Sequence, residues 1–348
     1  MIVDLRSDTF TLPSPKMRVR IASAEVGDEY YGEDPSVRRL EEHCKALSGK
    51  EGALFCTTGM LANQLAIACQ TSPGDEVVTE YGYHVHLYES GQYARFCQVV
   101  MNGRETEDGV LRASDIERAI ASKPRERTYC QVALASLENT ISGRQGKVFP
   151  FDALRQACEF TRAHGIRLHL DGARLLNAHV RTKIPVASYA EQTDTLSISF
   201  SKCLGAPLGS ILLGPADVIE RARRLRVWHG SGFHQIGFYA EAAYFALTQQ
   251  LGRLEEDHRL TSLLADLLAE EPLLGVRPDT VETNMVYLNF QGRSVSAEQF
   301  RRLCEENGVL AFTVPVNCLR LVVSRKVDED GIRTAARIIC RLSKRLSS

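Results

Sequence analysis

Short apolar runs alternate with segments of helical length along the first two thirds of the chain, and this alternation limits the possible folds more than any other feature. Because parallel neighbouring strands need a crossover connection, usually a helix, the pattern predicts an α/β fold with a mainly parallel sheet covered by helices. The last of these runs is expected to return along an edge of the sheet. Strands are expected over 52–57, 75–80, 96–101, 129–138, 166–171, 195–200 and 210–214. Helices are expected over 60–70, 113–122 and 151–165.

The pattern changes in the last third of the chain. A helix-rich stretch over 235–271 precedes a compact strand–helix–strand–helix tail. We therefore predict a large domain over 1–249, which includes the N-terminal segment, and a smaller α/β domain over 250–348. The elements of the tail are expected over 285–290, 297–308, 318–324 and from there to about residue 346.

Charge and composition argue against several classes of function. The formal net charge of −1 gives no bulk field for nucleic acid or an anionic membrane, and the basic run 221–226 is interpreted as a solvated or interface face. No apolar run approaches the ~18 residues of a membrane span. The polar start, residues 1–10, does not resemble a signal peptide. The ten cysteines form no C-x-x-C pair, which favours free thiols in a reducing cytoplasm over disulfides or structural zinc.

One lysine stands at the end of an apolar, strand-like run, in SFSKCLGAPLGS, residues 199–210. Lys202 is either a solvated lysine in a surface turn or a desolvated amine that forms a Schiff base with a carbonyl compound. The small residues after it would let a flat ring approach the backbone. The window alone leaves both interpretations open.

An acidic and a basic residue follow another predicted strand, in HLDGARLLNA, residues 169–178. Asp171 ends the apolar run and Arg174 lies three residues later. One interpretation is a helix cap with a salt bridge between them. The other is a carboxylate that pairs with a protonated ring nitrogen and leaves Arg174 for a substrate carboxylate.

Two further motifs fall at expected strand ends. The backbone N–H groups of Gly59 and Met60, at a predicted helix start, suit a phosphate. His84 and His86 stand two positions apart, so they share no helix face and do not predict a metal pair, but one imidazole could stack on a flat cofactor. A phosphate turn, an aspartate, an arginine and a strand-end lysine, in this order, are the groups that a pyridoxal-phosphate enzyme needs.

The chain resembles the low-specificity L-threonine aldolases, which belong to the β-eliminating lyases among the fold-type-I pyridoxal-phosphate enzymes. The resemblance runs from residue 4 to residue 324 and implies an aspartate-aminotransferase-like large domain. It is carried by DLRSDTFTLPS (4–14), GDEYYGEDPSVRRLEE (27–42), HVHLYESG (84–91), LENT (137–140), HLDGARLLNA, SKCLGAPLGS (201–210) and RLV (320–322).

The resemblance also implies roles for individual residues. Lys202 would bind the cofactor covalently, and Tyr31 would lie near the site, supplied by a neighbouring subunit of a homotetramer or homodimer with shared active sites. The other cofactor contacts would come from Gly59, Met60, His84, Asp171 and Ser201. The substrate carboxylate would be bound by Ser7, Arg174 and Arg320.

Five positions depart from the family pattern. Ile141 stands where the family has a histidine that contacts the substrate hydroxyl, and an aliphatic side chain cannot act as a base. The base would then have to be His84, His234, a water molecule or the phosphate. Alternatively, the pocket accommodates a substrate with a different side chain. The remaining departures are Met60 for threonine, Val227 for lysine, His234 for arginine and Ser324 for histidine.

The function predicted first is therefore a lyase that cleaves a β-hydroxy-α-amino acid to glycine and an aldehyde, or runs the reverse reaction. β-Elimination, racemisation or another amino-acid reaction on the same scaffold is the alternative that the departures motivate. A non-catalytic scaffold is the third, and the joint presence of Lys202, Asp171, Arg174 and Arg320 argues against it.

Overall fold

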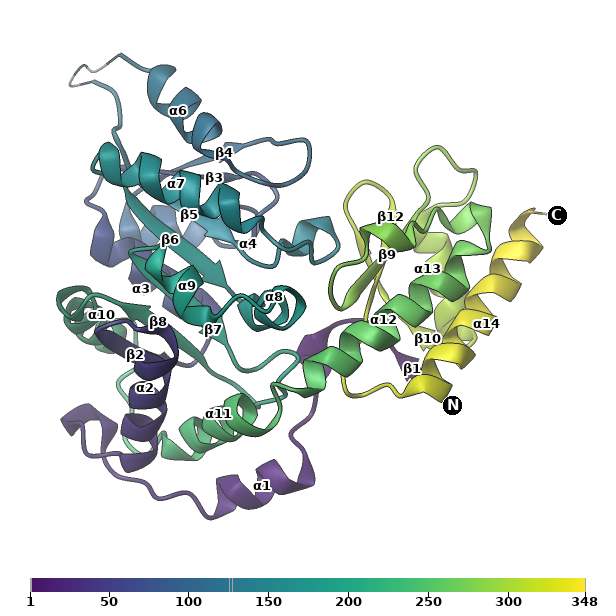
Figure 1. Cartoon of the computed structure of the whole chain (residues 1–348), viewed down its shortest axis with the longest axis horizontal. Helices are drawn as coiled ribbons and strands as arrows, with labels where there is room; N and C mark the ends of the chain where they lie inside the picture. The colour runs from purple at the N-terminus through teal and green to yellow at the C-terminus, as the bar shows by residue number, and fades with distance from the viewer. Residues whose placement is uncertain (1, 125, 127, 348) are drawn as a thin grey trace.

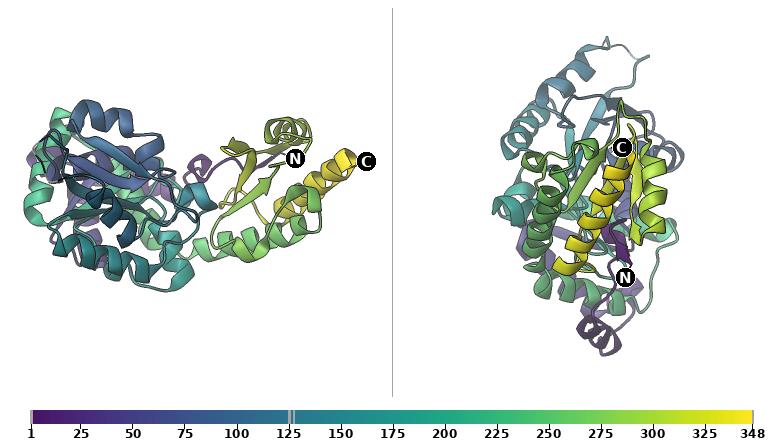
Figure 2. Two further views of the ribbon diagram at one scale, coloured as in Figure 1. Left: turned by 90° about the horizontal axis from the view of Figure 1, so that it is seen from above. Right: turned by 90° about the vertical axis from the view of Figure 1, so that its right-hand side faces the viewer.

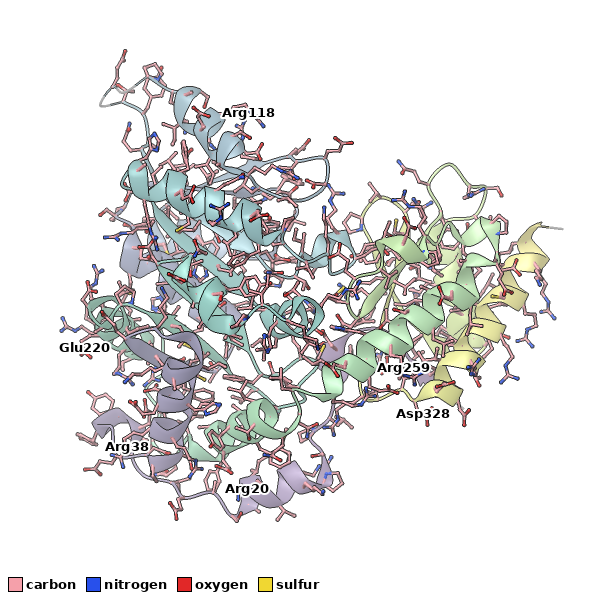
Figure 3. All side chains as sticks on the ribbon, viewed as in Figure 1. Arg20, Arg38, Arg118, Glu220, Arg259 and Asp328 are labelled. Carbon is pink, nitrogen blue, oxygen red and sulfur yellow. The ribbon has the colours of Figure 1, made fainter. Side chains whose placement is uncertain are left out.

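The computed structural model describes residues 2–124, 126 and 128–347. Two lobes lie side by side along the longest axis of the molecule (Figures 1 and 2). The large lobe is built around a seven-stranded sheet, and the small lobe holds a three-stranded sheet and a two-stranded one. Charged side chains such as Arg38, Arg118 and Glu220 point outward over the large lobe (Figure 3).

The large sheet has the order β2-β8-β7-β6-β5-β3-β4. Neighbours from β7 to β4 are parallel, and β8 is antiparallel to both β7 and β2. The mainly parallel α/β sheet is thus confirmed, but the edge position predicted for 210–214 is wrong, because β2 pairs with the far side of β8. The strands are β2 (Gly52–Cys56), β3 (Glu76–Glu80), β4 (Val100–Arg104), β5 (Val132–Glu138), β6 (Arg167–Gly172), β7 (Thr195–Ser199) and β8 (Ser210–Gly214).

Helices cover both faces of this sheet, and the strands β2, β3, β7 and β8 are therefore buried along their whole length. α3 packs on β7 and β8, α7 on β6, and α2 and α10 on β2. The helices are α1 (Pro15–Ala22), α2 (Pro35–Ser48), α3 (Gly59–Gln70), α4 (His84–Leu87), α5 (Ser90–Gln92), α6 (Ala113–Ala121), α7 (Phe151–Ala163), α8 (Leu175–Thr182), α9 (Val186–Glu191), α10 (Ala216–Trp228) and α11 (Gly237–Gln249).

One predicted strand begins later than expected. Within the range 96–101, Cys97 ends a π-helical turn, η3 (Tyr93–Cys97), and β4 starts only at Val100. Tyr93 and Cys97 are buried, so one face of the turn joins the core. Gln98 then takes a left-handed backbone conformation that ends the turn. An apolar run of this length does not distinguish a buried helical turn from a strand.

The small lobe combines the C-terminal third of the chain with the N-terminal residues. Its main sheet has the order β11-β12-β9, and β1 pairs in parallel with β10. Val3 and Leu5 therefore pack into the small-lobe core, whereas the prediction placed the N-terminal segment in the large domain. The elements are β1 (Val3–Asp4), α12 (Arg253–Ala269), β9 (Met285–Asn289), α13 (Ala297–Glu306), β10 (Val309–Leu310), β11 (Phe312–Val314), β12 (Cys318–Val322) and α14 (Glu329–Ser347).

The helix α12 joins the two lobes (Figure 1). Leu254 at its start belongs to the core of the large lobe, and Leu260, less than two turns later, belongs to the core of the small lobe. The boundary at residue 250 stays a prediction. The single-turn helices are η1 (Asp8–Phe10), η2 (Glu29–Tyr31), η4 (Ser142–Arg144), η5 (Pro272–Leu274) and η6 (Pro278–Thr280).

Two further properties of the chain concern membranes and disulfides. Within the described residues, no helix combines the length and the apolar composition that crossing a membrane requires. All ten cysteines are unpaired thiols, and eight of them are buried.

Asp34 is buried and ties three segments of the large lobe together. Its carboxylate accepts hydrogen bonds from the backbone N–H groups of Ser36 (3.0 Å) and Val37 (3.1 Å) at the start of α2. It also accepts from Gly27 (3.3 Å) and from Gly237 (2.8 Å) at the start of α11. These bonds hold η2 between two helices.

We expect Asp34→Ala to lower the free energy of unfolding by about 2–4 kcal/mol, because a helix cap is lost and buried N–H donors are left without acceptors. Denaturant unfolding followed by circular dichroism measures this change. Asp266→Ala, at an exposed position of α12, is the matched control and should change stability little. Equal effects of the two substitutions would contradict the assigned role of Asp34.

Candidate active site

Three chemically active side chains lie at the carboxyl ends of neighbouring parallel strands, where open α/β sheets bind their ligands. Glu138 ends β5 and pairs in register with Asp171 near the end of β6. Asp171 in turn pairs in register with Ser197 of β7, and Lys202 follows the end of that strand. The topology thus brings Asp171 and Lys202, both predicted from sequence, to one edge of the sheet.

Lys202 lies in the turn between β7 and β8. Its carbonyl oxygen accepts a hydrogen bond from Gly205 N (2.9 Å), which has a positive φ of 73°. Burial lowers the pKa of the Lys202 ammonium, and the nearby charge of Arg174 lowers it further. A lysine with a lowered pKa supplies the neutral amine that attacks a carbonyl carbon.

Asp171 is buried and held by two donors. Asn63 Nδ2 of α3 donates to Oδ2 (2.9 Å), and Ala173 N donates to Oδ1 (3.0 Å). The Asn63 amide oxygen is itself fixed by the Ser197 hydroxyl (2.9 Å) and His169 Nε2 (3.1 Å). Burial lowers the pKa of His169 to about 4, so this imidazole stays neutral and donates to Asn63. Asp171 is thereby fixed in position at the strand end.

His84 begins α4 and is linked to the same network. Its Nδ1 lies 2.5 Å from Oε1 of the buried Glu89, which also contacts Asn63 Nδ2 (3.4 Å). Burial lowers the pKa of His84, but the hydrogen bond and the charge of Glu89 outweigh this, and the pKa is raised overall. With Nδ1 on Glu89, Nε2 is the nitrogen that remains for a ligand. The imidazole is 37% exposed, and its ring contacts Tyr88 with centroids 4.9 Å apart.

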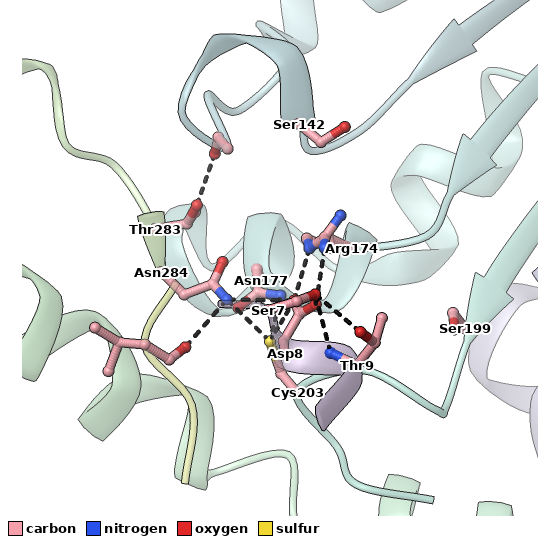
Figure 4. A network of polar contacts seen from close by, with 12 residues as sticks. Ser7, Asp8, Thr9, Ser142, Arg174, Asn177, Ser199, Cys203, Thr283 and Asn284 are labelled. Atoms are coloured by element: carbon pink, nitrogen blue, oxygen red, sulfur yellow. Dashed lines mark hydrogen bonds and ion pairs between the residues drawn. The ribbon is translucent and has the colours of Figure 1, made fainter. Parts of the chain in front are cut away.

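Arg174 forms a buried, two-pronged ion pair with Asp8 (Figure 4). Nε and Nη2 donate to the two carboxylate oxygens at 2.7 and 2.8 Å. The alternative of a salt bridge between Asp171 and Arg174 is therefore wrong. Burial alone would raise the pKa of Asp8, but the charge and hydrogen bonds of Arg174 hold it well below its usual range. Nη1 is the Arg174 nitrogen that this pair leaves available.

Ser7 and Arg320 approach from the N-terminal segment and the small lobe. The Ser7 hydroxyl caps η1 by accepting from Thr9 N (3.2 Å). Arg320 on β12 lies opposite Tyr287 of β9, and its Nε is a buried donor without a hydrogen-bond partner among the described residues. A buried N–H group of this kind is costly unless a ligand accepts from it, so Arg320 Nε is suited to a carboxylate.

The predicted phosphate turn lies at the start of α3. The Thr58 hydroxyl caps the helix by accepting from Leu61 N (3.1 Å). A methyl group at Gly59 would meet no atom within 4 Å, so an anion can approach this backbone. Met60 is largely exposed, and Ser201 Oγ lies 3.5 Å from Ser199 Oγ.

Tyr31 and His234 lie in a different cluster. Tyr31 is 73% exposed and packs on Tyr30, and His234 Nδ1 lies 2.8 Å from Asp28 Oδ2. Within the described residues, no hydrogen bond, ion pair or ring contact joins either side chain to Lys202. Their roles at the site remain predictions.

The departure at Ile141 has a clear structural setting. Ile141 is 1% exposed and belongs to the large-lobe core. The next residue, Ser142, donates its hydroxyl to Glu138 Oε1 at 2.8 Å. Burial and the neighbouring Asp171 raise the pKa of Glu138. The aliphatic side chain of Ile141 therefore belongs to the core, whereas the next residue contacts the polar end of β5.

Four residues of the site were not predicted to act in it. Asp8 and Glu138 stand within quoted motifs, but the pairing of Asp8 with Arg174 spans 166 positions and has no local signal. Asn63 and Gln64 interrupt an otherwise apolar helical run, and these two neighbouring amides were the available sign. Glu89 lies within the motif HVHLYESG, but nothing in the sequence indicates its pairing with His84.

The comparisons with known proteins agree with this arrangement. The family model described as beta-eliminating lyase matches residues 4–291. The chain is 35% identical over 333 residues to low-specificity L-threonine aldolase 1 of Arabidopsis thaliana, covering 95% of this chain and 93% of that protein. It is 37% identical over 336 residues to the low specificity L-threonine aldolase of Escherichia coli K12, covering 96% and 97%.

Solved structures give the same fold. A threonine aldolase from Leishmania major superposes with a TM-score of 0.82 at 20% identity, covering 98% of this chain and 99% of that one. An aspartate aminotransferase from Rhodobacter sphaeroides superposes with a TM-score of 0.75 at 16% identity, covering 100% and 94%. The predicted fold-type-I architecture is confirmed.

The Glu89–His84 pair gives a prediction about pH. Because the folded-state pKa of His84 is raised, the pair stabilises the fold fully below about pH 6.5 and loses this contribution as the pH rises through the raised value. We expect Glu89→Gln to lower the His84 midpoint measured by NMR titration of its Cε1 proton, assigned with His84→Gln. Glu159→Gln on the exposed face of α7 should leave the midpoint unchanged. An unmoved midpoint in Glu89→Gln would refute the coupling.

Proposed function

The chain belongs to the beta-eliminating lyase family, and we propose that it is a pyridoxal-phosphate-dependent lyase that cleaves a threonine-like β-hydroxy-α-amino acid to glycine and an aldehyde. The observation that carries the proposal is the meeting of Lys202, Asp171 and the Asp8–Arg174 pair at one sheet edge in a chain of this family. The reverse condensation uses the same groups.

The residues present fit the cofactor. A lysine with a lowered pKa suits an aldehyde, and a fixed carboxylate on the neighbouring strand suits a pyridine nitrogen. An open, glycine-containing helix start suits a phosphate. When bound, pyridoxal phosphate supplies an electron sink for the charge left at the substrate α-carbon. We propose that Lys202, Asp171, His84, Gly59, Met60 and Ser201 hold it.

The chain's own side chains orient the substrate. Arg320, Arg174 Nη1 and the Ser7 hydroxyl are the donors that we assign to its carboxylate. We propose that His84 Nε2 is the base that accepts the proton of the β-hydroxyl. Glu89 engages the other ring nitrogen, Nδ1, and the raised pKa of His84 makes the imidazole a stronger base. His234 is a weaker candidate for this role, since its Nδ1 pairs with Asp28 on an exposed surface.

The proposal also covers the cellular compartment of the protein and its oligomeric state. Ten unpaired thiols support a reducing compartment, which we take to be the cytoplasm. The exposed aromatic side chains of Tyr30, Tyr31 and Trp228 support a homo-oligomer, which we take to be a homotetramer or a homodimer with shared active sites.

Product analysis tests the reaction. We expect the holoenzyme to release glycine and the matching aldehyde from L-threonine, L-allo-threonine and phenylserine, and Lys202→Ala to abolish this release. Serine, cysteine and alanine serve as substrates for the other reactions of the scaffold. A keto acid with ammonia, or inversion at the α-carbon without glycine, would replace the aldol reaction by β-elimination or racemisation.

Arg320 gives a second test. Loss of one charge-assisted hydrogen bond to the carboxylate, about 1.5–3 kcal/mol, predicts that Arg320→Gln raises KM roughly 10- to 100-fold, with a smaller change in kcat. Steady-state kinetics with L-threonine measures this split. Arg302→Gln, on the exposed face of α13, is the matched control and should behave as the parent enzyme. A KM that stays unchanged in Arg320→Gln would remove Arg320 from substrate binding.

A further inference from the structure

A second polar cavity lies at the junction of the two lobes. It has a volume of about 360 Å³, and its lining includes Ser14, Lys16, Gln250, Arg253 and Arg325. Ser14 and Lys16 belong to the start of α1, Gln250 and Arg253 to the α11–α12 junction, and Arg325 to the segment between β12 and α14. Phe245 forms an apolar wall. The cavity is therefore shared between lobes.

The charge of this cavity is strongly positive. Three of its lining residues, Lys16, Arg253 and Arg325, are cationic, and none of the lining residues is acidic. Arg253 pairs with the carboxylate of the buried Asp257, whose Oδ1 lies 2.7 Å from Arg253 Nη1. Burial raises the pKa of Asp257 to about 7, which weakens it as a counter-ion near neutral pH.

Arg325 and Arg253 act on each other as like charges. Burial lowers the pKa of Arg325, and the charge of Arg253 lowers it further. For Lys16, no hydrogen bond or ion pair is found within the described chain. Like charges that line one cavity favour an anion between them.

Arg325 is held in position before any ligand binds. Gln250 Oε1 accepts a hydrogen bond from Arg325 Nη1 at 2.7 Å. Gln250 Nε2 donates to the Ser14 hydroxyl at 3.4 Å, and this hydroxyl caps α1 by accepting from Met17 N at 3.1 Å. One glutamine thus links the small-lobe arginine to the first helix of the large lobe.

The Arg325 side chain runs close to the turn that carries Lys202. A methyl group at Gly205 would lie 3.8 Å from Arg325 Cδ, and Gly205 N donates to the carbonyl oxygen of Lys202. The cavity and the candidate active site therefore adjoin opposite ends of one short turn.

We propose that this cavity is a binding site for a phosphate group, distinct from the cofactor site, that bridges the two lobes and stiffens the Lys202 turn. The ligand is either inorganic phosphate or the phosphate of a small metabolite. Arg325 and Arg253 supply planar guanidinium donors, and Lys16 supplies a mobile ammonium group. Phosphate binding at this cavity does not depend on which reaction the enzyme catalyses.

Calorimetric titration at constant ionic strength tests the proposed phosphate site. The holoenzyme is used because its cofactor already occupies the phosphate subsite of the active site. We expect saturable binding of inorganic phosphate, and a 10- to 100-fold weaker affinity in Lys16→Gln/Arg325→Gln. Arg224→Gln, an exposed substitution on α10, is the matched control and should bind as the parent does. Glycerol 3-phosphate as the titrant separates the two sources: tighter binding than inorganic phosphate assigns the site to a phosphorylated metabolite, and equal binding assigns it to the free ion.

Three results would overturn the proposal. These are the absence of saturable binding, equal affinity in the double variant and the parent, and a change of oligomeric state in the double variant with phosphate affinity unaltered. The last result, measured by light scattering, would assign the cations to a subunit contact. Lys16→Gln alone, at an exposed position, keeps the test valid if the double variant does not fold.

Discussion

The buried ion pair between Asp8 and Arg174 is the interaction on which the candidate site depends. Both side chains are almost completely removed from water, so each charge is tolerable only because the other is in place. Removing one partner of such a pair costs about 3–5 kcal/mol. Asp8 Oδ2 also accepts from Cys203 Sγ (3.1 Å) and from Asn284 Nδ2 (3.3 Å) of the small lobe (Figure 4). One carboxylate therefore joins the N-terminal segment, the turn beyond Lys202 and the second lobe.

This arrangement explains how a cationic lysine can lose its proton beside two carboxylates. Arg174 takes up most of the negative charge of Asp8 through two short hydrogen bonds, while its own charge still disfavours the ammonium form of Lys202. Asp171 is turned toward Asn63 and a backbone N–H, which supply donors without adding positive charge. The fold thus lowers the pKa of the lysine, by burial and then by the charge of Arg174, and holds the Asp171 carboxylate in place with a separate set of neighbours.

The sequence predicts most elements of the sheet, because short segments rich in β-branched and other apolar residues alternate with segments of helical length. It also predicts the strand-end residues Asp171 and Lys202, since polar groups after such runs gather at one edge. Long-range pairing is a different matter. The place of β8 inside the sheet, the capture of Val3 and Leu5 by the small lobe, and the partner of Arg174 all depend on tertiary contacts that no local pattern encodes.

Ile141, which stands where the family pattern has a histidine, limits which group of the site can act as a base. A histidine is replaced by a side chain that belongs to the core, so no group at this position can reach a substrate hydroxyl. The imidazole that we propose as the base is His84, and the hydrogen bond and charge of Glu89 both fix its tautomer and raise its pKa. Under this proposal one side chain would serve both proton transfer and ring stacking. Both proposed roles would then rest on the buried Glu89 carboxylate that holds the ring.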